Sequence, residues 1–220
     1  FFQPKDVVSG DFYWASLLPN KQFALITADS TGHGVPGAIM SMLNISCLKE
    51  AVESEKLITP KDILNHARKK VIDTLANDGS QEGGKDGMDC SLACFDFKAP
   101  ALHYAAANNP IWIARKYETQ DQDPVELIEL PCDKMPVGKH DRDTVSFQQN
   151  TFELKSGDMV YTLTDGFADQ FGGPKGKKFM YKKLKDLLVA ISQLSSEEQF
   201  NKVKQAFGGR IRFCVSLFSP

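Results

Sequence analysis

Apolar runs that end at glycine-rich turns and stretches with helical spacing fill the first third of the chain. The run from Phe23 to Ala28 is apolar and stops at Asp29, which predicts a buried strand. The stretch from Val35 to Val52 carries apolar side chains at helical spacing, namely Ile39, Met42, Leu43, Ile45 and Leu48. A second helix is predicted with Thr59 as its N-cap and an end near Asn77.

The middle of the chain predicts several strands in succession, separated by short turns. The strand candidates are Cys90 to Phe97, Leu102 to Ala107, Ile111 to Arg115, Val125 to Leu130, Val145 to Leu154 and Met159 to Thr164. Two further helices are predicted from Tyr181 to Gln193 and from Ser196 to Phe207. Helices, strands and helices in separate blocks indicate an α+β fold with antiparallel sheets. No repeat or shift in composition divides the chain, so residues 1–220 are expected to form one domain.

Composition and charge narrow the classes of function. Hydrophobic residues make up 42% of the chain and charged residues 25%, which is typical of a soluble globular protein. The net charge of −2 gives the chain no broad positive charge for binding nucleic acid. The sequence contains no run of about 18 apolar residues, so it predicts no membrane-spanning segment. Five cysteines, an odd number, indicate reduced thiols in the core of a cytoplasmic protein; they are Cys47, Cys90, Cys94, Cys132 and Cys214.

Three short segments place an aspartate where an apolar run meets a glycine turn. They are Ser9-Gly10-Asp11, the turn from Asp29 to Gly34, and Thr164-Asp165-Gly166. A carboxylate at a strand end points into the cleft that the strand tips form, and a neighbouring glycine lets a ligand approach the backbone. Such oxygen ligands suit magnesium or manganese, and two of these ions can activate a water for attack on a phosphoryl group. Each aspartate taken alone is also an ordinary turn residue, since Asp is common beside Gly.

A competing motif occupies the second of these turns. Residues 32–37 spell G-x-G-x-x-G after a strand and before a helix, which is the pattern of a dinucleotide-binding turn. That fold also requires a second parallel strand after the helix, ending in an acidic residue that binds the ribose. Another helix is predicted at that place, so the sequence argues against dinucleotide binding.

Six segments, in order along the chain, carry a family resemblance. They are PKDVVSGDFYW at 4–14, ITADSTGHGVPGAIMSML at 26–43, DGMDCSL at 86–92, AAANNPIW at 105–112, KMPVG at 134–138 and LKSGDMVYTLTDGFADQ at 154–170. Together they resemble the metal-dependent (type 2C) serine/threonine protein phosphatases, in particular the SpoIIE-like subgroup, over about residues 4 to 207. The resemblance implies a sandwich of two antiparallel β-sheets flanked by α-helices, which agrees with the block pattern.

The resemblance also implies roles for the three aspartates. Asp29 corresponds to the carboxylate that bridges two metal ions, and the carbonyl of Ser30 corresponds to a neighbouring ligand. Asp11 corresponds to an acidic residue that helps to hold the ions, and Asp165 to the metal ligand of the T-D-G motif. The implied cofactor is a pair of Mn²⁺ or Mg²⁺ ions.

Other polar residues in the matching segments receive lesser roles from the resemblance. His33 is expected to cap its loop. Asp86 and Asp89 are expected to be loop residues or to support the ligands rather than to be ligands themselves. Asn108 and Asn109 are expected to shape a turn.

Two features depart from the family pattern. Trp14 stands where many members have a second acidic residue, although aromatic residues also occur there. Asp169 stands where members often have an acidic residue, and its role stays open. The family ends with an Asp-Asp pair that supplies a further metal ligand, whereas no acidic residue follows Glu198 here and the tail from about residue 208 is atypical. One metal site is therefore expected to be weak. The sequence also starts abruptly, and the chain is expected to be a fragment of a longer protein with an N-terminal sensor region.

The sequence therefore predicts a phosphatase that hydrolyses phosphoserine or phosphothreonine on a regulatory protein, with a metal-activated water as the nucleophile. The resemblance implies a phosphorylated anti-sigma-factor antagonist, or a similar signalling protein, as the partner. The alternative is a catalytically weak or inactive phosphatase-like domain that serves in signalling or docking and has an incomplete metal centre. The missing tail carboxylate favours this alternative. In both cases Asp11, Asp29 and Asp165 are expected to meet at one cleft.

Overall fold

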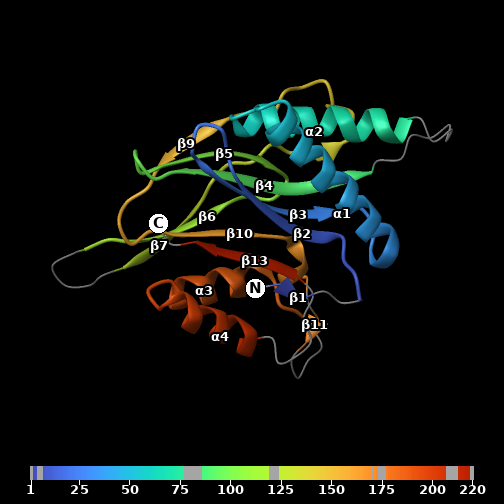
Figure 1. Cartoon of the computed structure of the whole chain (residues 1–220). Helices are drawn as coiled ribbons and strands as arrows, with labels where there is room; N and C mark the ends of the chain where they lie inside the picture. Colours follow the sequence, from blue (N-terminus) through green and yellow to red (C-terminus); the bar gives the residue numbers. More distant parts are fainter. Residues whose placement is uncertain are drawn as a thin grey trace.

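Two antiparallel sheets, packed face to face, form the centre of the molecule (Figure 1). The structure is a computed structural model, and it describes residues 2–3, 7–76, 86–118, 124–169, 171–172, 177–206 and 213–218. The first sheet has the order β2-β3-β4-β5-β9, and β8 pairs with β4. Its strands are β2 (Asp11–Leu17), β3 (Phe23–Ser30), β4 (Gly87–Asp96), β5 (Ala101–Ala107), β8 (Val137–Gly138) and β9 (Asn150–Glu153).

The second sheet has the order β1-β13-β10-β6-β7. Its strands are β1 (Phe2–Gln3), β6 (Trp112–Lys116), β7 (Val125–Glu129), β10 (Met159–Leu163) and β13 (Phe213–Phe218).

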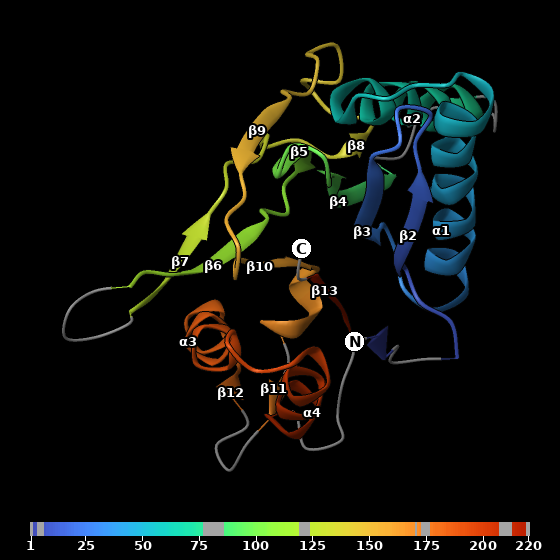
Figure 2. The ribbon, with the colours of Figure 1, turned by 60° about the vertical axis from the view of Figure 1, so that its left-hand side comes forward.

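Helices cover the outer faces of the two sheets. They are α1 (Gly34–Lys49), which continues into a π-helical turn over Glu50–Ser54, then α2 (Pro60–Leu75), α3 (Tyr181–Ile191) and α4 (Ser196–Ala206). Figure 2 shows α1 and α2 against the first sheet and α3 and α4 on the opposite side of the sandwich. A small hairpin pairs β11 (Phe171–Gly172) with β12 (Lys177–Lys178). The predicted sandwich of antiparallel sheets flanked by helices is confirmed.

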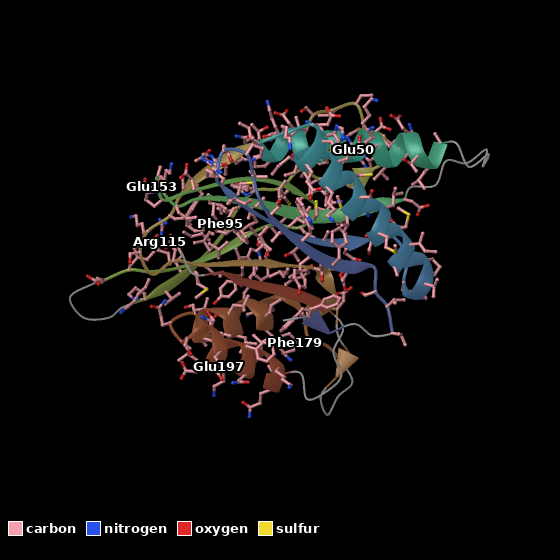
Figure 3. The ribbon with its side chains drawn as sticks, viewed as in Figure 1. Glu50, Phe95, Arg115, Glu153, Phe179 and Glu197 are labelled. Carbon is pink, nitrogen blue, oxygen red and sulfur yellow. The ribbon has the colours of Figure 1, made fainter. Side chains whose placement is uncertain are left out.

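Buried side chains form three layers. The first layer, which includes Ile26 and Leu64, packs α1 and α2 against the first sheet. The second layer lies between the sheets and includes Phe95, whose position inside the sandwich is visible in Figure 3. The third layer, which includes Tyr161 and Leu184, packs α3 and α4 against the second sheet. Burial of this apolar area is the main source of the fold's stability.

The start of α2 follows the sequence prediction. The Thr59 hydroxyl accepts a hydrogen bond from the backbone N–H of Asp62, and Pro60 occupies the first position of the helix. A threonine cap of this kind satisfies one of the backbone donors that every helix leaves open at its N-terminus.

Helix α1 buries only part of the apolar face that its spacing predicts. Ile39 and Met42 are 61% and 72% exposed. The buried residues of the helix are Gly37, Ser41, Asn44, Cys47 and Leu48. Ser41 and Asn44 reach backbone carbonyls at the turns beside the first sheet. Because these carbonyls need donors, two polar side chains face the sheet beside the apolar Cys47 and Leu48.

The predicted strand from Val145 to Leu154 is wrong in its first half, since only β9 is a strand. Residues 141–144 form a turn, and the next few residues are bound by side chains of α2. The Arg68 guanidinium donates to the Val145 carbonyl at 2.6 Å, and the Asn65 side chain accepts from the Phe147 N–H at 3.1 Å. Side-chain partners therefore replace the strand ladder at these residues.

Among the strands longer than two residues, two were not predicted. β2 pairs with β3 along its whole length. β13 pairs with β10, with Phe218 opposite Val160, and lies between β1 and β10. Part of the tail that the sequence marks as atypical is therefore an internal strand of the second sheet. Residues 208–212 lie outside the described residues.

The prediction that all five cysteines are core residues needs one correction. Cys47, Cys90 and Cys94 are buried free thiols. Cys132 is only half-buried, because it lies in the connection after β7 rather than in a strand, and its Sγ is 3.3 Å from the Lys134 ammonium. The side chain of Cys214 lies outside the described residues. In the part of the chain that the structure describes, no helix is long and apolar enough to cross a bilayer.

Candidate metal centre

Three aspartates lie side by side across the first sheet. Asp11, the first residue of β2, is paired with Asp29 on β3, and Asp29 is paired with Asp89 on β4. Paired residues of antiparallel strands point to the same face of a sheet. Leu25, on the same face of β3, packs between the two sheets. The three aspartates therefore form a row, here called the acidic row, at one end of the space between the sheets.

A fourth aspartate, Asp165, comes from the other sheet. It begins a single 3₁₀ turn after Thr164, immediately beyond the end of β10. The Asp165 carboxylate repels those of Asp11, Asp29 and Asp89, so all four groups lie within electrostatic reach of one another. The structure thus brings the three predicted aspartates together and adds Asp89 to them.

Hydroxyl groups lie directly beneath the acidic row. The Thr27 and Thr162 hydroxyls, one from each sheet, form a hydrogen bond of 2.8 Å. Ser91 is paired with Thr27 on the neighbouring strand and is fully buried. This polar layer separates the acidic row from the apolar layer between the sheets.

Burial and mutual repulsion raise the pKa values of the acidic row. Burial, with repulsion from Asp11 and Asp165, raises the pKa of Asp29 to about 8. Burial also raises the pKa of Asp11 to about 6. The pKa of Asp89 is raised by burial as well, although the Asn108 amide opposes the shift. At neutral pH and without a cation, Asp29 therefore keeps a proton.

Gly10 allows two backbone turns to meet beside the row. The Ser30 N–H donates to the Gly10 carbonyl at 3.0 Å. A Cβ atom at Gly10 would lie 2.7 Å from the carbonyl oxygens of both Ser30 and Gly32, and 3.6 Å from Oδ1 of Asp29. Only glycine fits such a close approach of backbone to backbone. The Ser30 carbonyl, the predicted neighbouring ligand, is therefore held close to the Asp29 carboxylate.

Two buried polar residues of α1 hold these turns, and the sequence analysis missed them. The Ser41 hydroxyl donates to the Gly10 carbonyl at 2.6 Å, and the Asn44 amide donates to the Ser30 hydroxyl at 3.0 Å. The same amide approaches the Gly87 carbonyl at 3.4 Å, at the start of β4. Polar residues three apart within an apolar helical stretch were the signal that could have identified them.

A pocket of about 430 Å³ opens beside the acidic row. Its lining residues are Asp29, Ser30, Thr31, Gly32, Met88, Asp89, Asn108 and Pro136. Gly32 has a φ of 92°, a left-handed conformation that places its backbone along the pocket wall without a side chain. The pocket thus combines two carboxylates, a side-chain amide and exposed backbone, which suits a polar, charged ligand.

The structure contradicts one of the lesser predictions and narrows another. His33 is exposed and occupies the N-cap position of α1, but its side chain makes no capping hydrogen bond. Asp89 is not a loop residue, because β4 begins two residues before it. Asp86 lies just before that strand and is half-buried. The prediction that Asn108 and Asn109 shape a turn is confirmed, since Asn108 has a φ of 60° and the Asn109 N–H donates to a carbonyl two residues back.

Trp14 and Asp169 lie outside the acidic row. Trp14 packs against the apolar layer beneath α1 and α2, and so occupies the face of β2 opposite to Asp11. Asp169 is exposed, and its backbone N–H donates to the Asp165 carbonyl at 3.1 Å. Its backbone thus continues the short turn that begins at Asp165.

The donor set fits a hard divalent cation, because it consists of carboxylates and a backbone carbonyl. Asp11 Oδ1 and Thr164 Oγ1 are buried and, among the described residues, have no hydrogen-bond partner of normal geometry, although the hydroxyl lies close enough to lower the pKa of Asp11. Over the same residues, no three His, Cys, Asp or Glu side chains are already arranged to hold an ion. Because like-charged carboxylates repel one another, a cation would have to draw them together.

Comparison with known protein families gives a match that covers most of the chain. The sequence profile described as Stage II sporulation protein E (SpoIIE) matches residues 19–213. A search of curated proteins gives no significant match.

Solved structures show the same fold. The SiaA-PP2C domain of Pseudomonas aeruginosa matches with a TM-score of 0.81 and 24% identity, over 100% of this chain and 83% of that one. The PP2C phosphatase domain of SpoIIE from Bacillus subtilis, with a fragment of its regulatory domain, matches with a TM-score of 0.65 and 19% identity, over 96% and 58%. RsbX in complex with magnesium matches with a TM-score of 0.63 and 16% identity, over 99% and 89%. The fold is therefore that of PP2C phosphatase domains.

Proposed function

The chain belongs to the SpoIIE family, and from that premise we propose that it is a metal-dependent phosphatase that hydrolyses phosphoserine or phosphothreonine on a protein. The observation that carries the proposal is the meeting of Asp11, Asp29 and Asp165 within electrostatic reach of one another, with Asp29 lining the pocket. These residues come from three separate segments and two different sheets. Carboxylates that lie close together despite burial and mutual repulsion are typical of a functional site.

We assign the cation ligands to Asp11, Asp29, Asp165 and the Ser30 carbonyl. Asp29 receives the bridging role because it lies in the middle of the acidic row, between strands β2 and β4. The magnesium complex of the similar protein RsbX supports Mg²⁺ or Mn²⁺ as the cofactor. The chemistry that such ions supply is an acidified water and neutralisation of charge on phosphoryl oxygens.

The chain's own residues prepare the site in three ways. The buried Thr27–Thr162 hydrogen bond joins the two sheets beneath the carboxylates and fixes their spacing. Ser41 holds the Gly10 turn, so that the Ser30 carbonyl keeps its position. Asp29 gives up its proton when a cation binds, because the positive charge reverses the effect of the surrounding carboxylates.

The partner and the cellular setting extend the same proposal. A phosphorylated regulatory protein of the anti-sigma-factor antagonist type is the proposed substrate, and an N-terminal sensor region is the proposed source of regulation. Membership of the SpoIIE family supports both. The buried free thiols of Cys47, Cys90 and Cys94 support a cytoplasmic setting, where thiols stay reduced.

Hydrolysis of an aryl phosphate and of a phosphoserine peptide, each measured with Mn²⁺ and with excess EDTA, tests the function. We expect activity that requires Mn²⁺ and disappears with EDTA. Activity that persists unchanged in EDTA would overturn the metal mechanism.

A catalytically weak signalling or docking domain is the second candidate. It is favoured by β13, whose six residues contain no acidic side chain, and by the open arrangement of the carboxylates. Mn²⁺ binding without hydrolysis of either substrate would support this candidate over the phosphatase.

A further inference from the structure

Asp89 lies in the acidic row by virtue of strand register. The pairing of β3 with β4 places Asp89 opposite Asp29, and the pairing of β2 with β3 places Asp11 on the other side of Asp29. Asp29 therefore has a carboxylate neighbour on each side.

The pocket lies on the Asp89 side of the row. Asp29 and Asp89 are both among its lining residues, together with Asn108. A ligand or ion that enters through the pocket consequently reaches Asp29 and Asp89 together. The carboxylate of Asp89 is half-buried, so it remains accessible from the pocket.

Asn108 holds one oxygen of Asp89 in place. Its Nδ2 donates to Asp89 Oδ1 at 2.8 Å. The backbone of Asn108 is itself fixed, because its N–H donates to the Asp133 carbonyl at 2.8 Å and it forms a parallel bridge with Cys90. The Asn108 amide therefore orients the Asp89 carboxylate through one oxygen and leaves the second oxygen for another partner.

The last strand of the second sheet, β13, supplies no carboxylate to the site. β13 consists of Phe213–Phe218, which contains no acidic residue, and it is paired with β10, the strand that leads to Asp165. The negative charge that a divalent cation needs beside Asp29 would therefore have to come from the acidic row and Asp165.

We propose that Asp89 is a further carboxylate ligand of the cation beside Asp29, and that Asn108 is its positioning residue. The inference rests on the proposed function, because it concerns the cation of that same site. It adds a ligand that the sequence analysis placed among loop or supporting residues. Outer hydrogen-bond partners of metal ligands typically change metal affinity by about 10- to 100-fold.

Titration calorimetry with Mn²⁺ alone, supported by electron paramagnetic resonance of free Mn²⁺, tests the proposal without a phosphatase assay. Asp89→Asn keeps the shape of the side chain and removes its charge. We expect its Kd for Mn²⁺ to rise about tenfold or more above that of the unsubstituted chain. Asp96→Asn is the matched control, because it makes the same change at the other end of β4, and its Kd is expected to stay unchanged.

Asn108→Gly tests the positioning role, since glycine tolerates the positive φ of this residue and removes only the amide. We expect a smaller rise in Kd, and no further rise when the change is added to Asp89→Asn. A purely structural role of Asn108 would instead add its effect in the double variant.

The outcomes separate this inference from the proposed function. If Asp29→Asn weakens Mn²⁺ binding but Asp89→Asn behaves like Asp96→Asn, the inference is overturned and the proposed function stands. If the unsubstituted chain shows no saturable Mn²⁺ binding, both are overturned. Thermal unfolding of each variant without metal shows whether the fold is retained.

Discussion

The two ends of the space between the sheets are built on the same strands and have opposite character. Along β3 the residues on this face are Phe23, Leu25, Thr27 and Asp29, and along β4 their paired residues are Phe95, Ala93, Ser91 and Asp89. One end is therefore apolar, the middle carries hydroxyls and the other end is acidic. Strand alternation alone sets which residues face inward, so a single pair of strands provides both a stabilising core and a destabilising site.

The difference between the apolar end and the acidic end indicates which residues stabilise the fold and which serve the site. Apolar side chains gain free energy when they leave water, whereas carboxylates lose it unless a cation or a proton compensates. The apolar end is expected to control unfolding. The acidic end is expected to control metal binding and activity, and to reduce the stability of the metal-free protein.

Phe95→Ala is expected to have the largest effect. Phe95 is 1% exposed and packs between the sheets, so its truncation should lower the free energy of unfolding by about 3–5 kcal/mol. Urea unfolding provides the measurement. Phe97→Ala is the matched control, because Phe97 is stacked on Phe95 but is 60% exposed and should cost about 1 kcal/mol or less. Equal losses in the two variants would show that the apolar end is not the stabilising one.

Asp29→Asn is expected to lower phosphatase activity by about 100-fold or more, which corresponds to about 2.7 kcal/mol of transition-state stabilisation. Asp11→Asn should lose less, because Asp11 lies at the edge of the acidic row and Asp29 lies at its centre. The comparison uses kcat/KM for an aryl phosphate at saturating Mn²⁺. Equal and mild losses from both changes would contradict the bridging role of Asp29.

Thr27→Val tests the hydroxyl layer between the two ends. The change removes the partner of the buried Thr162 hydroxyl and should lower the free energy of unfolding by about 1–3 kcal/mol. The double change Thr27→Val with Thr162→Val should recover part of this loss, since no unpaired hydroxyl of this pair then remains. A double variant as unstable as the sum of two single losses would show that the layer depends on other contacts.

The pH dependence of stability tests the acidic end in the metal-free protein. The folded-state pKa of Asp29, about 8, and that of Asp11, about 6, both exceed the ordinary value of 3.8. The metal-free folded protein therefore binds more protons than the unfolded chain between about pH 4 and pH 8, and its stability contribution from these groups falls as pH rises through that range. Chemical denaturation in EDTA from pH 5 to pH 8 measures it, as the difference between the unsubstituted chain and Asp29→Asn. A difference that does not change with pH would contradict the raised pKa.

Local sequence pattern predicts most of the architecture but only part of the site. β4, β5, β6, β7 and β10 are apolar runs bounded by turns, and the helices show helical spacing or caps, so both could be predicted. β2 could not, because its exposed residues Tyr13 and Leu17 are as apolar as the buried Phe12, which hides the alternation of a strand.

The missing parts of the site depend on contacts between distant segments. Asp89 joins the acidic row only through the register of β3 with β4, and spacing along the chain does not fix register. Ser41 and Asn44 are important because backbone carbonyls of other segments face them, which local pattern does not contain. Asp11, Asp29 and Asp165 could be predicted because each lies where an apolar run meets a glycine turn.

Proton release on Mn²⁺ binding is the most direct test of the claim that the acidic end is a cation site. Calorimetric titration at pH 7 in two buffers of different ionisation enthalpy counts the protons that leave. Because Asp29, with a pKa of about 8, holds a proton in the metal-free protein, we expect saturable binding that releases close to one proton, and much less release in Asp29→Asn. Absence of saturable Mn²⁺ binding, or binding with the same proton release in both proteins, would contradict a cation site at Asp29.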